Sequence, residues 1–289
     1  MLIDMHVHVR EPGGEQKETW DTCSRAALKG GNGLICAMPN TNPCCTNEDV
    51  YNLVNNLAKT KSVCDYMIFM GADGENYKDL EYMNPKVCAI KFYLNETYST
   101  LKINNISVLR QYFIHCPDNM LMCFHAEVEM VGVVLYLASI YNKRVHICHI
   151  SRKEEIEMVK DAKEKGLRVT CEVTPHHLFM NDEIMNGLDP HFRTVKPVVN
   201  SDEDRKALWD NMDMIDCFAT DHAPHLKTEK QSCGCPGFTG LETALPLLLN
   251  AVNEGRLTID DIIEKYHTNP KRILGLNENY GTNSYVEVN

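Results

Sequence analysis

Short apolar runs alternate along the chain with longer segments whose apolar residues recur every three or four positions. A β-type run followed by a helical period is typical of parallel βα units. The short runs predict β-strands at residues 2–5, 34–38, 66–70, 89–92, 121–124, 145–148, 169–173 and 217–219. The longer segments predict helices at residues 18–29, 107–115, 129–141, 153–165, 202–211 and 241–253, and one capped by Asn47.

This order of elements predicts an α/β fold. Eight strands with interleaved helices in 289 residues favour a (β/α)8 TIM barrel. A doubly wound open sheet is the alternative, but no glycine-rich fingerprint opens a helix after the first strand. Because 44% of the residues are hydrophobic and the composition has no break, residues 1–289 are expected to form a single domain.

Charge and apolar length limit the choice of partners. The formal net charge is -11, and the lysines and arginines are spread along the chain, which argues against nucleic acid or an anionic membrane as a partner. The longest apolar stretch, at residues 131–140, is shorter than the roughly 20 residues that cross a bilayer. We therefore expect a cytoplasmic protein that binds a small molecule.

The 13 cysteines predict reduced thiols instead of a disulfide framework, because their number is odd and the first residues do not resemble a secretory leader. Cys233 and Cys235 lack CxxC spacing, so no metal or redox role is expected for them. Cys148 is expected to pack in the core, on the strand face opposite His149.

Polar side chains occupy the ends of the predicted strands. Active sites of (β/α)8 barrels gather at the C-terminal ends of the strands, so these side chains are expected to converge. His6 and His8 are two residues apart, and side chains at that spacing share one face of a strand and can hold one ion. The residues at successive strand ends are His6, His8, Asn40, Lys91, His125, His149 and Asp221.

Lys91 is unusual in this set because an ammonium group repels cations and cannot bind a metal. A buried neutral lysine amine can instead add carbon dioxide and become a carbamate, an anion with two oxygens that can bridge two metal ions. Mixed nitrogen and oxygen ligands suit zinc, although nickel, cobalt and manganese are alternatives. The pattern therefore indicates a metal centre with two ions.

Several segments together resemble one known family. The strings HVHVREPGG, AMPNTNP, KFYLNET, HICHISRKEEI, VTCEVTPHHLF, CFATDHAPH and PGFTGLETALPLLL occur in order between about Leu2 and Val288. They are similar to the dihydroorotases of the amidohydrolase superfamily, and closely so to the dihydroorotase domain of animal multifunctional pyrimidine-synthesis polypeptides. The resemblance implies a TIM barrel of the metal-dependent hydrolase type.

The resemblance also implies a ligand set for two zinc ions. His6, His8, Lys91 and Asp221 would hold one ion. Carbamylated Lys91, His125 and His149 would hold the other, with a hydroxide between the two metals. Asp221 would be the catalytic residue that moves the proton. Glu172 matches a family glutamate near the metals, as an additional ligand or a support for the ligands.

Substrate contacts follow from the same resemblance. A guanidinium can bind a carboxylate through two parallel hydrogen bonds, so Arg10 predicts a substrate with a carboxylate. Thr97 falls in a segment that corresponds to a mobile loop over the substrate. Lys196 stands where animal relatives carry an arginine, which would weaken substrate binding. The substrate-binding residues implied are Arg10, Asn40, Thr97, Lys196, His225, Pro236 and Gly237.

The implied reaction is the reversible cyclisation of N-carbamoyl-L-aspartate to L-dihydroorotate in de novo pyrimidine synthesis. The alternatives are another cyclic-amide hydrolase, of the dihydropyrimidinase, hydantoinase or allantoinase type, and a non-catalytic assembly module. We expect a homodimer or a part of a multienzyme polypeptide, without the terminal strands of longer relatives. The segment 260–274 could form a dimer surface or cover the barrel.

Overall fold

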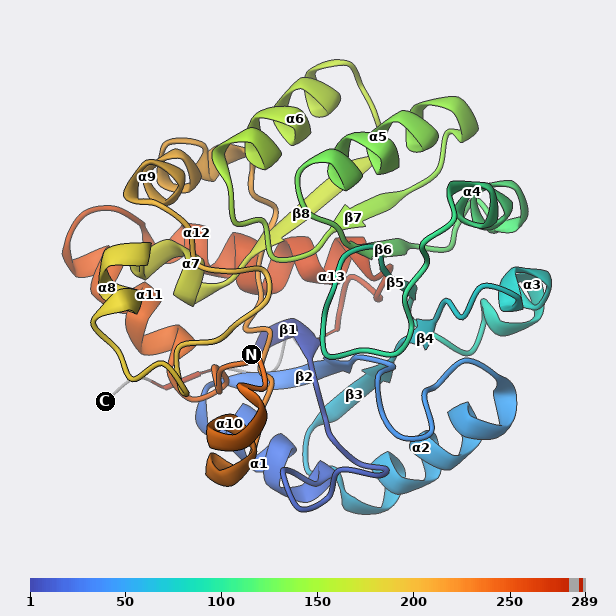
Figure 1. Cartoon of the computed structure of the whole chain (residues 1–289), viewed down its shortest axis with the longest axis horizontal. Helices are drawn as coiled ribbons and strands as arrows, with labels where there is room; N and C mark the ends of the chain where they lie inside the picture. The colour runs from blue at the N-terminus through green and yellow to red at the C-terminus, as the bar shows by residue number, and fades with distance from the viewer. Residues whose placement is uncertain (281–285, 288–289) are drawn as a thin grey trace.

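A computed structural model describes residues 1–280 and 286–287 of the chain (Figure 1). The far end of the resemblance, at Val288, lies outside the described residues. The strands lie at the centre of the molecule, and helices surround them (Figure 1). The strands are β1 (Leu2–Val7), β2 (Asn32–Ala37), β3 (Asp65–Ile68), β4 (Met70–Gly71), β5 (Ile90–Tyr93), β6 (Met122–His125), β7 (Val145–Ile147), β8 (Val169–Val173) and β9 (Cys217–Phe218).

The strands form the predicted α/β barrel. Each strand pairs in parallel with the next one in the orders β1-β2-β3 and β4-β5-β6-β7-β8-β9. A parallel bridge from Val7 to His222 brings the segment after β9 against β1. Backbone hydrogen bonding continues there, since the amide of His8 donates to the carbonyl of His222 at 2.8 Å. The C-terminal ends of the strands therefore meet at one rim.

One predicted strand, at residues 66–70, is divided in the structure into β3 and β4. The division occurs at Phe69, where the chain changes its hydrogen-bonding neighbour. The amide of Phe69 donates to Ala37 at the end of β2, whereas the amide of Met70 donates to Ala89 before β5. The interruption thus reflects pairing with two different strands, which local sequence does not specify.

The seven predicted helices are all present, and their ends differ from the predicted ones by at most three residues. The first helix begins at Trp20 because the side chain of Thr19 accepts a hydrogen bond from the amide of Thr22 and caps the helix. These helices are α1 (Trp20–Lys29), α2 (Glu48–Lys61), α4 (Ile106–His115), α5 (Glu129–Tyr141), α6 (Lys153–Glu164), α9 (Asp202–Asp210) and α11 (Ala244–Asn253).

Short helices, too short to leave a periodic signal, complete the chain: α3 (Leu80–Met83), α7 (Pro175–Phe179), α8 (Asp182–Asn186), α10 (Lys227–Cys233), α12 (Ile259–Ile263), η3 (Glu264–Thr268) and α13 (Asn269–Ile273). The last two pack against the strands: η3 contacts β1 and β9, and α13 contacts β1, whereas α12 contacts η3 and α11. Tyr266 is fully buried there. The segment 260–274 therefore covers the barrel, which is one of the two roles predicted for it. None of the helices in the described range has the length and apolarity that a membrane-spanning helix requires.

The interior of the barrel is apolar below the polar rim. Residues from strands that are far apart in the sheet order, such as Met5 on β1 and Cys123 on β6, belong to one buried cluster. A second cluster, which includes Phe92 and Phe124, packs the outer faces of the strands against the helices. The alternation of β5 places Phe92 outward and Lys91 inward. Lys91 therefore enters the barrel from a strand that is buried on both faces.

Candidate metal centre and substrate pocket

The predicted metal ligands converge at the rim. His6 lies on β1, Lys91 on β5, His125 at the end of β6 and Glu172 on β8, while the other three ligands, His8, His149 and Asp221, lie one to three residues beyond β1, β7 and β9. His149 and Asp221 have φ values of 35° and 49°, in the left-handed region. The seven candidates are all buried: His6, His8, Lys91, His125, His149, Glu172 and Asp221.

His6, His8 and Asp221 form one group whose potential ligand atoms lie within 4.8 Å of one another. Oδ1 of Asp221 is 3.0 Å from Nε2 of His8 and 3.3 Å from Nε2 of His6. Nδ1 of His8 lies 2.7 Å from Oδ1 of Asn40. An amide oxygen only accepts, so Nδ1 carries the proton of a neutral His8 ring and Nε2 presents its lone pair to Asp221.

The charges around this group favour a cation. Burial lowers the pKa of His8 to about 4, so the ring is neutral and two acceptor atoms face each other at 3.0 Å. Burial and the charge of Lys91 lower the pKa of His6, but Glu172 and Asp221 together raise it to about 10. Burial raises the pKa of Asp221, yet His6 and His8 outweigh burial and hold it below its usual range. Glu172 and Asp221 thus favour positive charge at His6, and a divalent cation between the imidazole nitrogens and the carboxylate of Asp221 could supply that charge in place of the proton.

His125 and His149 form the second group. Nδ1 of His125 lies 2.9 Å from Nε2 of His149, and the two rings meet edge to face. Burial lowers the pKa of both rings, which keeps them neutral. Nδ1 of His149 is buried and has no hydrogen-bond partner among the described residues. A metal ion that binds the facing nitrogens would suit this pair, because neutral imidazole is a good zinc ligand.

Lys91 is completely buried beside the first group. Its Nζ atom is 3.5 Å from Nε2 of His6 and 3.0 Å from Sγ of Cys148. No carboxylate of the described residues lies within ion-pair distance of this Nζ atom, and a buried ammonium without a counter-ion is costly. The contact corrects one expectation: Cys148 is buried, but its sulfur faces the metal ligands instead of only the apolar core.

Glu172 lies beneath His6. One carboxylate oxygen contacts Nδ1 of His6, and the other lies 3.1 Å from Nε2 of His146. Burial raises the pKa of Glu172, but the charge of His6 and the hydrogen bond from His146 outweigh it and lower the pKa well below the usual range. Glu172 is thus an ionised carboxylate that orients His6, and with His6 and Cys148 it forms another group of potential ligands within 4.8 Å.

A pocket opens above these ligands. The predicted residues Arg10, Asn40, Thr97, Lys196, Pro236 and Gly237 line it together with His6, His8, His125, His149 and Asp221. Lys91 and Glu172 lie below its floor and His225 lies behind Arg10, so these three are near the pocket but do not line it.

Sequence reasoning missed three lining residues: Tyr93, Tyr98 and Ala223. Each was detectable, because Tyr93 is two residues beyond Lys91 on the same strand face, Tyr98 follows Thr97, and Ala223 lies between Asp221 and His225. The hydroxyl of Tyr93 is buried and has no partner in the described part of the chain. It can therefore donate a hydrogen bond to a molecule in the pocket.

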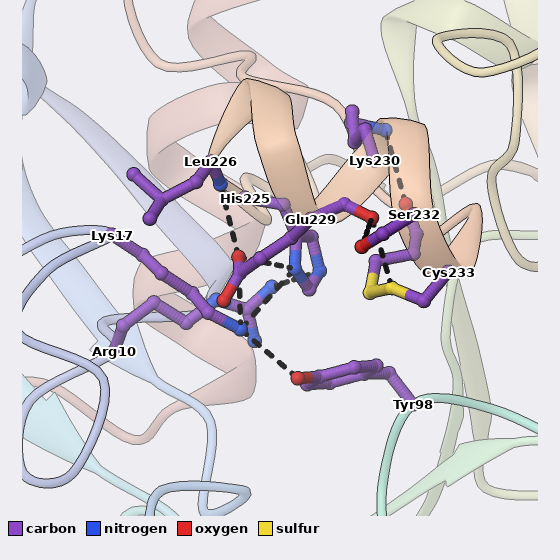
Figure 2. Close-up of a disulfide and its surroundings, with 10 residues drawn as sticks. Arg10, Lys17, Tyr98, His225, Leu226, Glu229, Lys230, Ser232 and Cys233 are labelled. Atoms are coloured by element: carbon purple, nitrogen blue, oxygen red, sulfur yellow. Dashed lines mark hydrogen bonds and ion pairs between the residues drawn. A yellow bond between two sulfur atoms is a disulfide. The ribbon is translucent and has the colours of Figure 1, made fainter.

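Arg10 is a buried guanidinium, and only 6% of its surface is exposed. Its Nε atom donates to the carbonyl of Pro224 at 3.1 Å, and Nη2 lies 3.1 Å from Nε2 of His225. No carboxylate of the described residues forms an ion pair with it. Figure 2 shows Arg10 directed toward His225, with Lys17 and Tyr98 beside it. Arg10 therefore presents an uncompensated positive charge at the pocket.

The loop around Thr97 lies over the pocket. Tyr98 packs its ring edge against the ring of His225, with ring centres 4.7 Å apart. Its hydroxyl accepts a hydrogen bond from Nζ of Lys17 at 3.0 Å, and the guanidinium of Arg10 lies 5.7 Å from the ring centre (Figure 2). These contacts hold the loop against the substrate pocket.

One disulfide contradicts the expectation that all cysteines are reduced. Cys233 and Cys235 are bonded to each other at the end of α10, and the other cysteines are free (Figure 2). The pair directly precedes Pro236 and Gly237, whose backbone lines the pocket. A spacing of one intervening residue did not suggest this bond because redox-active pairs more often have the CxxC spacing.

Comparisons with known proteins agree with the geometry. A family model described as Dihydro-orotase-like matches residues 1–109. The "Multifunctional protein CAD" of Squalus acanthias is 48% identical over 288 residues, which is 99% of this chain and 13% of the shark protein. The dihydroorotase of Pyrococcus furiosus is 35% identical, with 97% of this chain and 67% of the archaeal protein covered. The chain thus spans only a small part of the long multifunctional relative.

Solved structures with the same fold include cyclic-amide hydrolases. The L-hydantoinase of Arthrobacter aurescens superimposes with a TM-score of 0.89 at 22% identity, covering 95% of this chain and 70% of that one. An inactive dihydroorotase-like domain of a Chaetomium thermophilum CAD-like multifunctional protein gives a TM-score of 0.81 at 25% identity, covering 96% and 80%. Fold, site and sequence together define a TIM-barrel member of the amidohydrolase superfamily. The chain belongs to the dihydroorotase family of the amidohydrolase superfamily.

Proposed function

We propose that the chain catalyses the zinc-dependent, reversible cyclisation of N-carbamoyl-L-aspartate to L-dihydroorotate. The observation that carries this proposal is the pairing, in one pocket, of a buried cluster of potential metal ligands with Arg10, a buried cation that has no carboxylate partner among the described residues. The cluster suits hydrolysis of an amide, and Arg10 suits a substrate that carries a carboxylate.

Two zinc ions would bind to the two groups of ligands. His6, His8 and Asp221 would hold one ion, His125 and His149 the other, and carbamylated Lys91 would bridge both. The fit of these residues rests on the facing lone pairs of His8 and Asp221, on the unpartnered Nδ1 atom of His149, and on the burial of Lys91 without a carboxylate partner among the described residues. When bound, the metal pair supplies an activated water and polarises the carbonyl of the substrate.

Asp221 would transfer the proton. Its pKa is held below the usual range, so it is a carboxylate at neutral pH and can accept a proton. In ring opening it would take the proton of the attacking water and deliver it to the leaving ring nitrogen. In ring closure it would remove the proton of the ureido nitrogen. Its left-handed backbone at φ 49° aims the side chain between His6 and His8.

Binding of the substrate carboxylate would fall to Arg10, Asn40 and Lys196, with His225 behind Arg10. Thr97 and Tyr98 would cover the bound ring and exclude water. The backbone of Pro236 and Gly237 would contact the ring amide. Gly237 has a φ of 144°, and a Cβ atom there would lie 2.4 Å from the carbonyl oxygen of Ala223, so this approach requires glycine.

A substrate panel tests the proposal. Zinc-loaded protein should hydrolyse dihydroorotate and act far more weakly on dihydrouracil and hydantoin, which lack the carboxylate and leave Arg10 unpaired. A preference for dihydrouracil or hydantoin would instead identify a different cyclic-amide hydrolase. Folded, zinc-loaded protein with no activity on any of the three would indicate a non-catalytic module, as the name of the Chaetomium domain states for that protein.

A further inference from the structure

A third group of potential metal ligands lies outside the pocket. Glu18, Cys23 and His222 place a carboxylate oxygen, a sulfur and a ring nitrogen within 4.8 Å of one another. Glu18 precedes α1, Cys23 lies on α1, and His222 follows Asp221 directly. The composition of this group would suit zinc, so the protonation of His222 decides what the group can do.

The ring of His222 carries its proton on Nε2. Its Nδ1 atom accepts hydrogen bonds from the amides of Gly240 at 3.1 Å and Leu241 at 3.4 Å, and a backbone amide can only donate. Nδ1 therefore bears no proton. Nε2 lies 3.0 Å and 3.2 Å from the two carboxylate oxygens of Glu18 and donates its proton to them.

This arrangement disfavours a metal ion at the group. A metal at Nε2 would require His222 to lose its remaining ring proton, because Nδ1 is already occupied as an acceptor. Cys23 is fully buried, and burial together with the charge of Glu18 raises the pKa of its thiol well above the usual value. The contacts are instead those of a satisfied hydrogen-bond network that joins three separate segments of the chain.

The backbone of His222 lies where the barrel closes. Its carbonyl accepts from the amide of His8, and it forms parallel bridges with Val7 and Phe238. The next residue, Ala223, donates its amide to the carbonyl of Phe238 at 2.7 Å and lines the pocket. The preceding residue is Asp221, whose left-handed backbone must be held by its surroundings.

We propose that Glu18 and His222 are positioning residues that fix Asp221 and Ala223 relative to His8 and the substrate pocket. This inference rests on the proposed function of Asp221. The side chain of His222 ties its segment to Gly240 and Leu241 on one side and to Glu18 on the other, so the segment cannot rotate. Neither residue lines the pocket. Their effect on the reaction would therefore pass through the orientation of Asp221.

Two substitutions of His222 separate its two hydrogen bonds. His222→Asn retains an oxygen near the position of Nδ1, which can accept from Gly240, but loses the donor to Glu18. His222→Gln retains a donor near Nε2 and loses the acceptor. Glu18→Gln removes the charge of the acceptor. Cys23→Ser is the matched control, because it changes the third member of the group and leaves the proposed network in place.

The test measures kcat, KM for dihydroorotate, metal content and the visible absorption of the cobalt-substituted protein. We expect Glu18→Gln and His222→Asn to lower kcat about 10- to 100-fold, with KM changed less than about threefold and metal content unchanged. The cobalt bands should shift, because Asp221 changes its orientation at the metal. His222→Gln, which retains the donor to Glu18, should have a kcat between those of the parent and His222→Asn. Cys23→Ser should match the parent in every measurement.

Several results would overturn the inference. One is the loss of a metal ion in Cys23→Ser, which would show a metal site at the group. A second is cobalt bands in Glu18→Gln that equal those of the parent. A third is a kcat of Glu18→Gln and His222→Asn that equals that of an active parent, and a fourth is a parent that binds no cobalt. An inactive parent whose cobalt bands shift in Glu18→Gln would contradict the proposed function and still support the positioning of Asp221. The two proposals can therefore fail separately.

Discussion

Nε2 of His8 lies 3.0 Å from Oδ1 of Asp221, and the hydrogen bond of His8 to Asn40 leaves both atoms as acceptors. Two buried acceptors at this distance repel each other unless a cation lies between them. The second group also has an unsatisfied atom: His125 and His149 can share one hydrogen bond at 2.9 Å, but Nδ1 of His149 is buried and has no partner among the described residues. The metal centre is thus expected to stabilise the folded protein as well as to support catalysis.

Removal of metal should lower the thermal midpoint of unfolding. A ligand present at 100 times its dissociation constant stabilises a protein by about 2.7 kcal/mol, so chelation should lower the midpoint by about 5 to 10 °C. Differential scanning calorimetry with and without a chelator measures the change, and added zinc should restore the midpoint. An equal midpoint in the metal-free and zinc-loaded forms would contradict the proposed ligand set.

Substitution of Lys91 should abolish metal binding at the shared position. Lys91→Ala removes the amine that would become the bridging carbamate, so activity should fall more than about 100-fold and zinc content should decrease. Elemental analysis and the hydrolysis rate measure both effects. Reconstitution of metal-free parent protein should also need bicarbonate. Full zinc content in bicarbonate-free buffer would show that Lys91 is not carbamylated.

Substitution of Lys196 by arginine should strengthen substrate binding. Lys196 lines the pocket, and a guanidinium there could bind the substrate carboxylate with two hydrogen bonds instead of one point charge. A gain of about 1 kcal/mol corresponds to a KM lower by roughly fivefold. Lys196→Gln is the control and should raise KM. If Lys196→Arg and Lys196→Gln both leave KM unchanged, Lys196 does not contact the substrate.

The protonation of His225 should not affect substrate binding near neutral pH. Burial and the charge of Arg10 lower the pKa of His225 to about 3, so the ring is neutral at every pH well above that value. Between pH 5.5 and 8.5, KM of the parent and KM of His225→Gln should therefore depend on pH in the same way. His225→Ala should raise KM about tenfold, because Arg10 loses the acceptor that orients it. A step in the parent near pH 6.5 that is absent from His225→Gln would contradict this assignment.

Much of the fold could be predicted from the sequence because the barrel strands and the longer helices have distinct periods. The run at residues 66–70 was predicted as one strand, and its division at Phe69 arises from pairing with two neighbours, which no local pattern encodes. Helices such as α10, at Lys227–Cys233, are too short to show a helical repeat. The disulfide between Cys233 and Cys235 depends on the local turn and not on composition.

The candidate site could be predicted to a similar extent, and for a physical reason. Parallel strands bring their C-terminal ends together, so the sequence predicts that polar residues at strand ends, such as His6 and His125, meet at one rim. Residues that contact the ligands from outside the pocket have no comparable pattern in the sequence. His146 contacts Glu172 and His222 contacts Glu18, and both pairs depend on tertiary packing.

The most direct test of the account compares the parent with Arg10→Gln and Lys91→Ala in the hydrolysis of dihydroorotate, followed by the loss of absorbance of the ring amide. The account predicts activity in the zinc-loaded parent, a KM at least about tenfold higher in Arg10→Gln and no measurable activity in Lys91→Ala. A folded, zinc-loaded parent without activity, or an Arg10→Gln variant with the KM of the parent, would contradict the account.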